Sequence, residues 1–233
     1  MMNLGKMIMM GLFLFLAGCG SVEVAHNQAD ASLDNKGRIT QQNTWCNGRY
    51  GSGGRIAAYY EGSVSNYFPS GVNYTNVYDS ARAQWSGISS NVAVNKTSST
   101  LNTPDKYYVG TTATPFLFGR ITTFYYDYYG NLVQSDPQNI TSEDTNSNWV
   151  KTHVSLYDNQ MNNYGLTTTQ RVYVATHEIG HTLKLAHLDD TLTCTQTPLP
   201  SGERSVMQSG DGNVLNWGVQ PYDKRELKAK WGL

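Results

Sequence analysis

The spacing of apolar residues along the chain predicts a mixture of helices and strands. Apolar side chains recur every three or four residues, the period of an amphipathic helix, in a segment at 74–85, in one beginning near Thr168 and in one beginning near Pro221. Alternating or short apolar runs bounded by turn residues indicate strands at 55–60, 92–94, 107–109, 120–126 and 150–157. The order of these elements predicts one α+β domain that spans residues 44–233.

The first residues show the pattern of an export signal. Lys6 precedes an apolar run, Met7 to Ala17, that is too short to cross a bilayer of about 30 Å as a helix. The run ends Leu16-Ala17-Gly18-Cys19, which resembles the lipobox of bacterial lipoproteins. The resemblance implies that residues 1–18 are a signal peptide and that Cys19 becomes a lipidated N-terminus. Its acyl chains would anchor the exported protein to the bacterial cell surface or membrane; plain secretion with cleavage near Gly18 is the alternative.

Residues 19–43 and the overall composition narrow the choice of partners. The segment 19–43 is polar and has no periodicity, so we expect a flexible tether between the membrane and the domain.

The 233 residues include 17 Lys and Arg against 18 Asp and Glu, a formal net charge of −1. Proteins that bind nucleic acid usually carry a positive surplus that neutralises phosphates. We therefore expect no nucleic-acid partner.

One predicted helix contains the candidate metal-binding and catalytic residues. In His177-Glu178-Ile179-Gly180-His181 the two histidines are four apart, so on a helix both rings point the same way. Their nitrogens can then meet one zinc ion at about 2.0–2.1 Å. Glu178 lies beside the pair without being a ligand, which is where a base acting on a metal-bound water should be.

His187 is the candidate third ligand. On a continued helix its ring would be rotated by about 240° from that of His181, so the helix has to end between the two residues. Families that share this spacing usually place a Gly at the turn, because a left-handed residue is needed there. This chain has Lys184 instead, at a cost of about 1–2 kcal/mol that a fold can tolerate.

Two further patterns extend the histidine motif. Met207, in Ser205-Val206-Met207-Gln208, lies 20 residues after His187. Together with HExxHxxxxxH it resembles the Met-turn of the metzincin zinc peptidases, in which a Met beneath the three histidines supports the metal site without binding the ion. The end of the chain matches the ending of matrixin catalytic domains at Asp223, Leu227, Trp231 and Gly232. From about residue 44 onward the chain therefore resembles a bacterial matrixin-like metzincin.

The resemblance implies a zinc-dependent endopeptidase, expected to be monomeric, that acts on protein or peptide substrates. His177, His181 and His187 would hold one catalytic zinc ion, and Glu178 would be the general base. The strand at 150–157 would pair with an extended substrate, and the loop 188–204 would shape one wall of the specificity pocket. Family members often bind calcium as well. Oxygen ligands could come from Asp127, Asp189 and Asp190, although no spacing among them is specific for calcium.

The cysteines left after Cys19 are Cys46 and Cys194. In an exported protein a disulfide between them is the simplest interpretation, and it would tie the start of the domain to the loop after the zinc site. Free thiols, or Cys46 capping the zinc ion as a latency switch, are the alternatives.

Two other functions fit parts of the same pattern. The first is a thermolysin-like peptidase with Glu203, 22 residues after His181, as the third ligand. The second is a surface-anchored binding protein with a non-catalytic zinc site. The intact Glu178 argues against the second, whereas Lys184 in place of the usual Gly leaves room for it.

Overall fold

The computed structural model describes residues 43–51, 53–66, 68–190, 192–193, 199–208 and 216–232. Within these residues a six-stranded sheet has the order β2-β1-β3-β6-β4-β5. Strands β1, β2, β3 and β6 run parallel, whereas β4 pairs antiparallel with β6 and with β5. The strands are β1 (Gly54–Tyr60), β2 (Val92–Thr97), β3 (Asp105–Gly110), β4 (Gly119–Tyr126), β5 (Leu132–Gln134) and β6 (Trp149–Tyr157).

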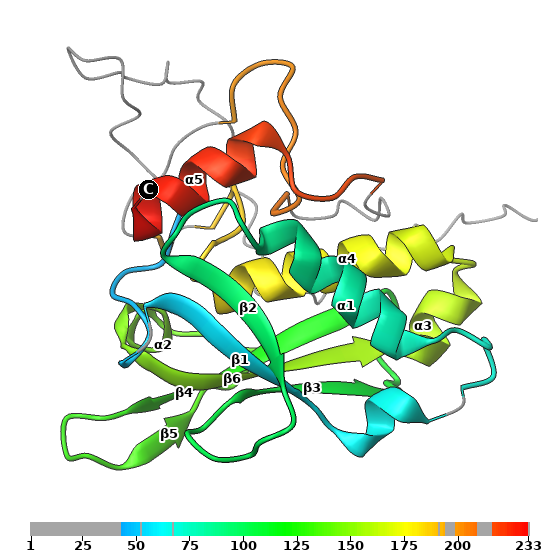
Figure 1. Ribbon diagram of the computed structural model, residues 1–233, viewed down its shortest axis with the longest axis horizontal. Coiled ribbons are helices and arrows are strands. Elements are labelled where there is room, and N and C mark those ends of the chain that lie inside the picture. Colours follow the sequence, from blue (N-terminus) through cyan, green and yellow to red (C-terminus); the bar gives the residue numbers. More distant parts are fainter. Residues whose placement is uncertain are drawn as a thin grey trace, which may run out of the picture.

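The main helices cover one face of this sheet. Figure 1 shows α1 and α4 side by side above the strands, with α5 farther out on the same side. The helices are α1 (Tyr74–Trp85), α2 (Ser142–Asn146), α3 (Asp158–Asn163), α4 (Thr168–Thr182) and α5 (Pro221–Trp231), and a short 3-10 helix, η1, covers Gly62–Ser65. The mixed α/β arrangement is compatible with the predicted α+β class.

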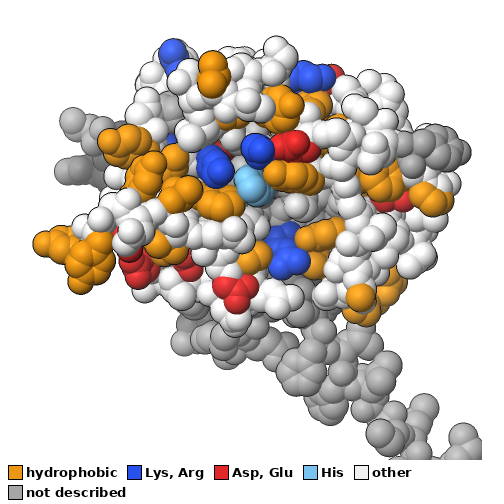
Figure 2. All heavy atoms as spheres, turned by 90° about the horizontal axis from the view of Figure 1, so that it is seen from below, with side chains coloured by type: hydrophobic (Ala, Val, Ile, Leu, Met, Phe, Trp, Pro, Cys, Tyr) orange, Lys and Arg blue, Asp and Glu red, His pale blue; other side chains and the backbone are white. Residues whose placement is uncertain are grey.

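The core lies between the helices and the sheet. Trp85 of α1 and Ile179 of α4 are fully buried, as is Leu156 of β6. The indole nitrogen Nε1 of Trp85 donates to the carbonyl of Thr176 at 2.8 Å, which fixes α1 against α4. The opposite face of the sheet is open, and in Figure 2 it carries a histidine with Lys and Arg side chains around it.

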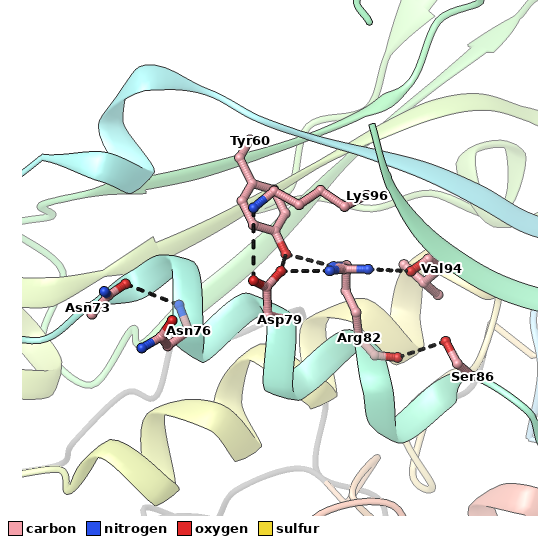
Figure 3. Close-up of polar contacts among 8 residues, drawn as sticks. All are labelled: Tyr60, Asn73, Asn76, Asp79, Arg82, Ser86, Val94 and Lys96. Carbon is pink, nitrogen blue, oxygen red and sulfur yellow. Dashed lines mark hydrogen bonds and ion pairs between the residues drawn. The ribbon is translucent and has the colours of Figure 1, made fainter. Parts of the chain in front are cut away.

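A polar cluster joins α1 to the strands beneath it (Figure 3). Arg82 donates to the carboxylate of Asp79 at 2.6 Å and to the hydroxyl of Tyr60 at 2.6 Å. The same guanidinium donates to the carbonyl of Val94 at 2.8 Å, and the ammonium of Lys96 lies 4.3 Å from the centre of the Tyr60 ring. One helix face thereby contacts both β1 and β2, which sets the position of α1 beside α4.

Each predicted helix and strand is present, with ends that differ by a few residues. The segments that the sequence did not reveal are short: α2 has five residues, α3 has six and β5 has three. Such lengths span too few positions for a hydrophobic period to show.

The expectation that the strand at 150–157 is a substrate-binding edge is wrong. Strand β6 lies inside the sheet, between β3 and β4, so both of its edges are occupied by neighbouring strands. Alternation of side chains reveals a strand but says nothing about its neighbours. The free edge nearest α4 belongs to β4, because β5 covers β4 only from Phe124 onward.

The first 42 residues lie outside the described part of the chain, so the signal peptide, Cys19 and the tether remain predictions. Among the described residues, no helix is both long enough and apolar enough to pass through a lipid bilayer.

Candidate metal centre

Helix α4 positions two of the three histidines. Its N-terminus is fixed by a capping box, in which the Thr167 hydroxyl accepts from the Gln170 backbone and the Gln170 side chain accepts from the Thr167 backbone. The helix runs to Thr182, so His177 and His181 lie one turn apart in its last turns. A well-anchored helix therefore presents both rings on the same side.

The chain turns sharply after α4, as the histidine spacing predicted. Lys184 has a φ of 69°, the left-handed conformation that the sequence analysis assigned to it. Its N–H donates to the His181 carbonyl at 2.9 Å, and the N–H of Leu185 donates to the Gly180 carbonyl at 3.2 Å. These bonds close the helix end and bring His187 back over α4.

The turn places three imidazoles around a common point. The Nε2 atoms of His177 and His187 are 3.0 Å apart, and that of His181 lies 3.1 Å from each of them. Nitrogens bound tetrahedrally to one zinc ion at 2.0–2.1 Å would be separated by about 3.4 Å, so the cluster is close to the size that a metal ion requires. Among the described residues, these three histidines form the group of His, Cys, Asp and Glu side chains arranged to hold a metal ion.

The hydrogen bonds of the Nδ1 atoms, which point away from the cluster, indicate that a cation fits between the Nε2 atoms. His177 Nδ1 lies 2.6 Å from the Val206 carbonyl, and His181 Nδ1 lies 2.8 Å from the Leu185 carbonyl. A carbonyl oxygen can only accept, so each Nδ1 carries the proton. Each Nε2 atom of His177 and His181 then carries a lone pair that faces the other. This arrangement is unfavourable unless a cation lies between the two atoms. Metal-bound histidines usually have this arrangement of outer hydrogen bonds.

Burial keeps the three rings neutral, the form that binds metal. It lowers the pKa of His177 to about 3, with a further contribution from the nearby His187. Burial also holds the pKa of His181 well below its ordinary value and lowers that of His187. Protons therefore compete weakly for these nitrogens near neutral pH.

Glu178 is buried, and it is next to His177 in the chain. Burial raises the pKa of its carboxyl group to about 8, partly offset by the positive charge of Arg120. Its Oε2 atom is buried and has no hydrogen-bond partner among the described residues. Gly119, the first residue of β4, packs against it: a β-carbon at position 119 would stand 2.7 Å from Glu178 Cγ. The sheet edge and the candidate base are thus in direct contact.

Lys184 also has a contact that a Gly could not make. Its side chain is fully buried, and its ammonium donates to the carbonyls of Thr145 and Ser147, each at 2.8 Å. The same ammonium lies 3.8 Å from the centre of the Trp149 ring. Carbonyls at the end of α2 and the face of an aromatic ring both favour a positive charge. Burial opposes it and, with the charges of Lys230 and Arg49, lowers the pKa of Lys184 to about 6. Lys184 therefore ties the ligand-bearing turn to α2.

Met207 packs against α4, and Asp223 holds the segment that contacts His177. Met207 is buried and packs against α4, where a β-carbon on Gly180 would stand 2.4 Å from the Met207 sulfur. Asp223 of α5 accepts hydrogen bonds from the Ser205 hydroxyl and from the Val206 backbone, the latter at 3.0 Å. The Val206 carbonyl accepts a hydrogen bond from Nδ1 of His177. Through Ser205 and Val206, α5 therefore helps to orient the His177 ring.

The remaining candidate ligands are engaged elsewhere. Glu203 forms an ion pair with Arg225, so it does not join the histidine cluster. The carboxylate of Asp127 accepts hydrogen bonds within its own turn, from the backbone of Tyr129 and Asn131. That of Asp190 accepts from Trp45 Nε1 at 2.7 Å. Asp189 follows the third histidine by two residues, and among the described residues it belongs to no group of three or more His, Cys, Asp or Glu side chains that could hold a metal ion.

Cys46 forms a disulfide, as the sequence analysis expected. The predicted partner, Cys194, lies outside the described residues, so the pairing itself remains a prediction.

Sequence reasoning missed two residues that shape the centre. Trp45 stacks on His181 with ring centroids 5.2 Å apart and an interplanar angle of 20°. Gly119 makes room for Glu178, as described above. Neither residue lies near the motif in the chain, and neither belongs to a recognisable pattern, so only the fold could reveal them.

No family model matches the chain, and a search of curated proteins finds no relative.

Proposed function

We propose that this protein is a zinc-dependent endopeptidase. The observation that supports this most directly is the convergence of three neutral imidazoles, with Nε2 atoms 3.0–3.1 Å apart, next to a buried carboxyl group. Three protein nitrogens leave an ion with a position for water or substrate, which is typical of catalytic rather than structural zinc sites. The same arrangement is what the resemblance to matrixin-like metzincins implies.

In this proposal three histidines bind the metal ion and Glu178 transfers the proton. His177, His181 and His187 would hold the ion, which when bound supplies Lewis-acid polarisation of a water molecule and of a peptide carbonyl. Glu178 would accept a proton from the attacking water and deliver it to the amine that leaves.

The free edge of β4 is suited to align an extended substrate. The Phe118 carbonyl accepts from Tyr157 of β6, so alternate residues, Gly119 and Ile121, direct their peptide groups away from β6. At the next outward position, Thr123, those groups bind Ser135 instead. No described strand covers Gly119 or Ile121. A peptide paired there would pass directly beside Glu178.

The proposal also includes export of the protein and a lipid anchor at its N-terminus. The apolar run that ends at Cys19 predicts a lipidated N-terminus, and the disulfide at Cys46 fits an oxidising compartment outside the cytoplasm. Cys19→Ser should move the protein from the membrane fraction to the soluble fraction of the producing cell. Unchanged membrane association of that variant would contradict the lipid anchor.

Cleavage of a denatured protein substrate tests the proposed activity. We expect the purified mature chain to cleave it, to lose this activity when a chelator removes the metal, and to regain it when zinc is restored. A protein that binds zinc but cleaves nothing under these conditions would instead be the surface-anchored binding protein considered above.

A further inference from the structure

Three aromatic side chains gather at the start of the free β4 edge. The rings of Phe116 and Tyr164 have centroids 4.2 Å apart, and Phe118 meets Tyr164 edge-on at 5.7 Å. Phe116 and Phe118 belong to the loop between β3 and β4, whereas Tyr164 follows α3. None of the three is buried, and Tyr164 is 41% exposed. Two separate loops thus bring partly exposed rings together at one place.

The loop that carries Phe116 is held in an unusual shape. Phe116 has a φ of 60°, a left-handed conformation that bulky residues rarely adopt and that costs about 1–2 kcal/mol. Such a conformation persists only where the surroundings maintain it. Here Thr112 exchanges hydrogen bonds with the Asn159 side chain at 3.1 and 2.8 Å, and the Phe118 carbonyl accepts from Tyr157 at 2.9 Å. Both ends of the loop are therefore fixed while the Phe116 ring points to Tyr164.

The cluster lies within reach of a peptide at the candidate active site. Gly119 contacts Glu178, and three residues of extended chain separate Phe116 from Gly119, at most about 10 Å. A substrate paired with the β4 edge advances by about 3.3 Å per residue. A side chain two or three residues from the scissile bond would therefore meet these rings.

We propose that Phe116, Phe118 and Tyr164 form a substrate subsite that takes an aromatic or large aliphatic side chain. This inference rests on the proposed peptidase function and adds a substrate preference to it. Such a side chain would cover ring surface that now faces water and would stack on or against the rings. A small side chain would leave that surface exposed and gain nothing from the cluster.

A positional peptide library, with products identified by mass spectrometry, tests the subsite. For the wild type we expect one position, two or three residues from the cleaved bond, at which Phe or Leu is preferred over Ala by about tenfold or more. Tyr164→Ala and Phe116→Gly should reduce that ratio to about threefold or less, whereas Tyr164→Phe should retain it. Gly at 116 removes the ring without requiring a strained backbone. Tyr126→Ala, at the far end of β4, is the control and should change no preference.

The ratio is measured within each variant, so a variant that is merely less stable would not imitate the result. The Tyr164→Ala variant should lose more of its cleavage of peptides with Phe at the selected position than of its cleavage of peptides with Ala there. A wild type that cleaves peptides without such a preference, or a preference that survives both ring deletions, would overturn the subsite while leaving the peptidase intact. A wild type that cleaves no peptide would overturn both proposals.

Discussion

Gly119 at the start of β4 lies against Glu178 of α4, so closely that a β-carbon at position 119 would stand 2.7 Å from Glu178 Cγ and 2.8 Å from its Oε1. The residue that begins the free sheet edge thereby determines where the candidate base can lie. In the proposed peptidase this one contact would couple substrate alignment to proton transfer.

Gly119→Val should displace Glu178 and lower peptide hydrolysis by about 100-fold, because a shift of about 1 Å in a catalytic group can have that effect. Zinc content should be unchanged, since the atoms nearest to a β-carbon at position 119 belong to Glu178 and not to the histidines. Gly110→Ala is the matched control: Gly110 also lies in a strand, and a β-carbon there meets no atom within 4 Å. Wild-type hydrolysis rates in Gly119→Val would contradict the coupling.

Lys184 should stabilise the fold in spite of its strained backbone. Lys184→Ala removes the two hydrogen bonds to Thr145 and Ser147 and keeps the left-handed residue, so we expect the free energy of unfolding to fall by about 2–3 kcal/mol. Lys184→Gly loses the same bonds but relieves the strain, and should be about 1 kcal/mol more stable than the Ala variant. Urea unfolding of the three proteins measures both differences. A Gly variant more stable than the wild type would show that the ammonium contacts contribute little.

Gly180→Ala should destabilise the protein even though Ala is the better helix former by about 1 kcal/mol. The added methyl would overlap the sulfur of Met207 and the ring of Trp85, at 2.4 and 2.8 Å. Overpacking of this kind typically costs about 1–3 kcal/mol. In the background of Met207→Ala the penalty should shrink, and an unchanged penalty in the double variant would exclude Met207 as its cause.

His153, on the open face of the sheet, should make stability depend on pH. Burial, with the positive charges of Lys151 and Lys106, lowers its pKa from 6.5 to about 4. The folded chain therefore binds this proton less tightly than the unfolded chain, and stability should be lost as the pH falls from about 6.5 towards 4. Because the side chain is only partly buried, we expect a loss on the order of 1 kcal/mol. His153→Gln should show a weaker pH dependence in urea unfolding; identical curves would contradict this assignment.

The histidine cluster was predictable from sequence because helical geometry is local. The spacing of His177 and His181 fixes their common face, and the spacing to His187 requires the helix to end between His181 and His187. The structure ends α4 at Thr182 and turns at Lys184. The sheet was less predictable. The position of β6 inside the sheet and the approach of Gly119 to Glu178 depend on residues far apart in the chain. The same is true of the buried contacts of Lys184, which involve the short helix α2.

The most direct test of the account is the zinc content of the purified protein, measured together with peptide hydrolysis, for the wild type and for Glu178→Gln and His187→Ala. We expect one zinc ion per chain and hydrolysis in the wild type, one zinc ion without hydrolysis in Glu178→Gln, and strongly reduced zinc binding in His187→Ala. Full activity in Glu178→Gln, or wild-type zinc affinity in His187→Ala, would contradict the central claim that three histidines and one buried carboxyl group form a catalytic zinc site.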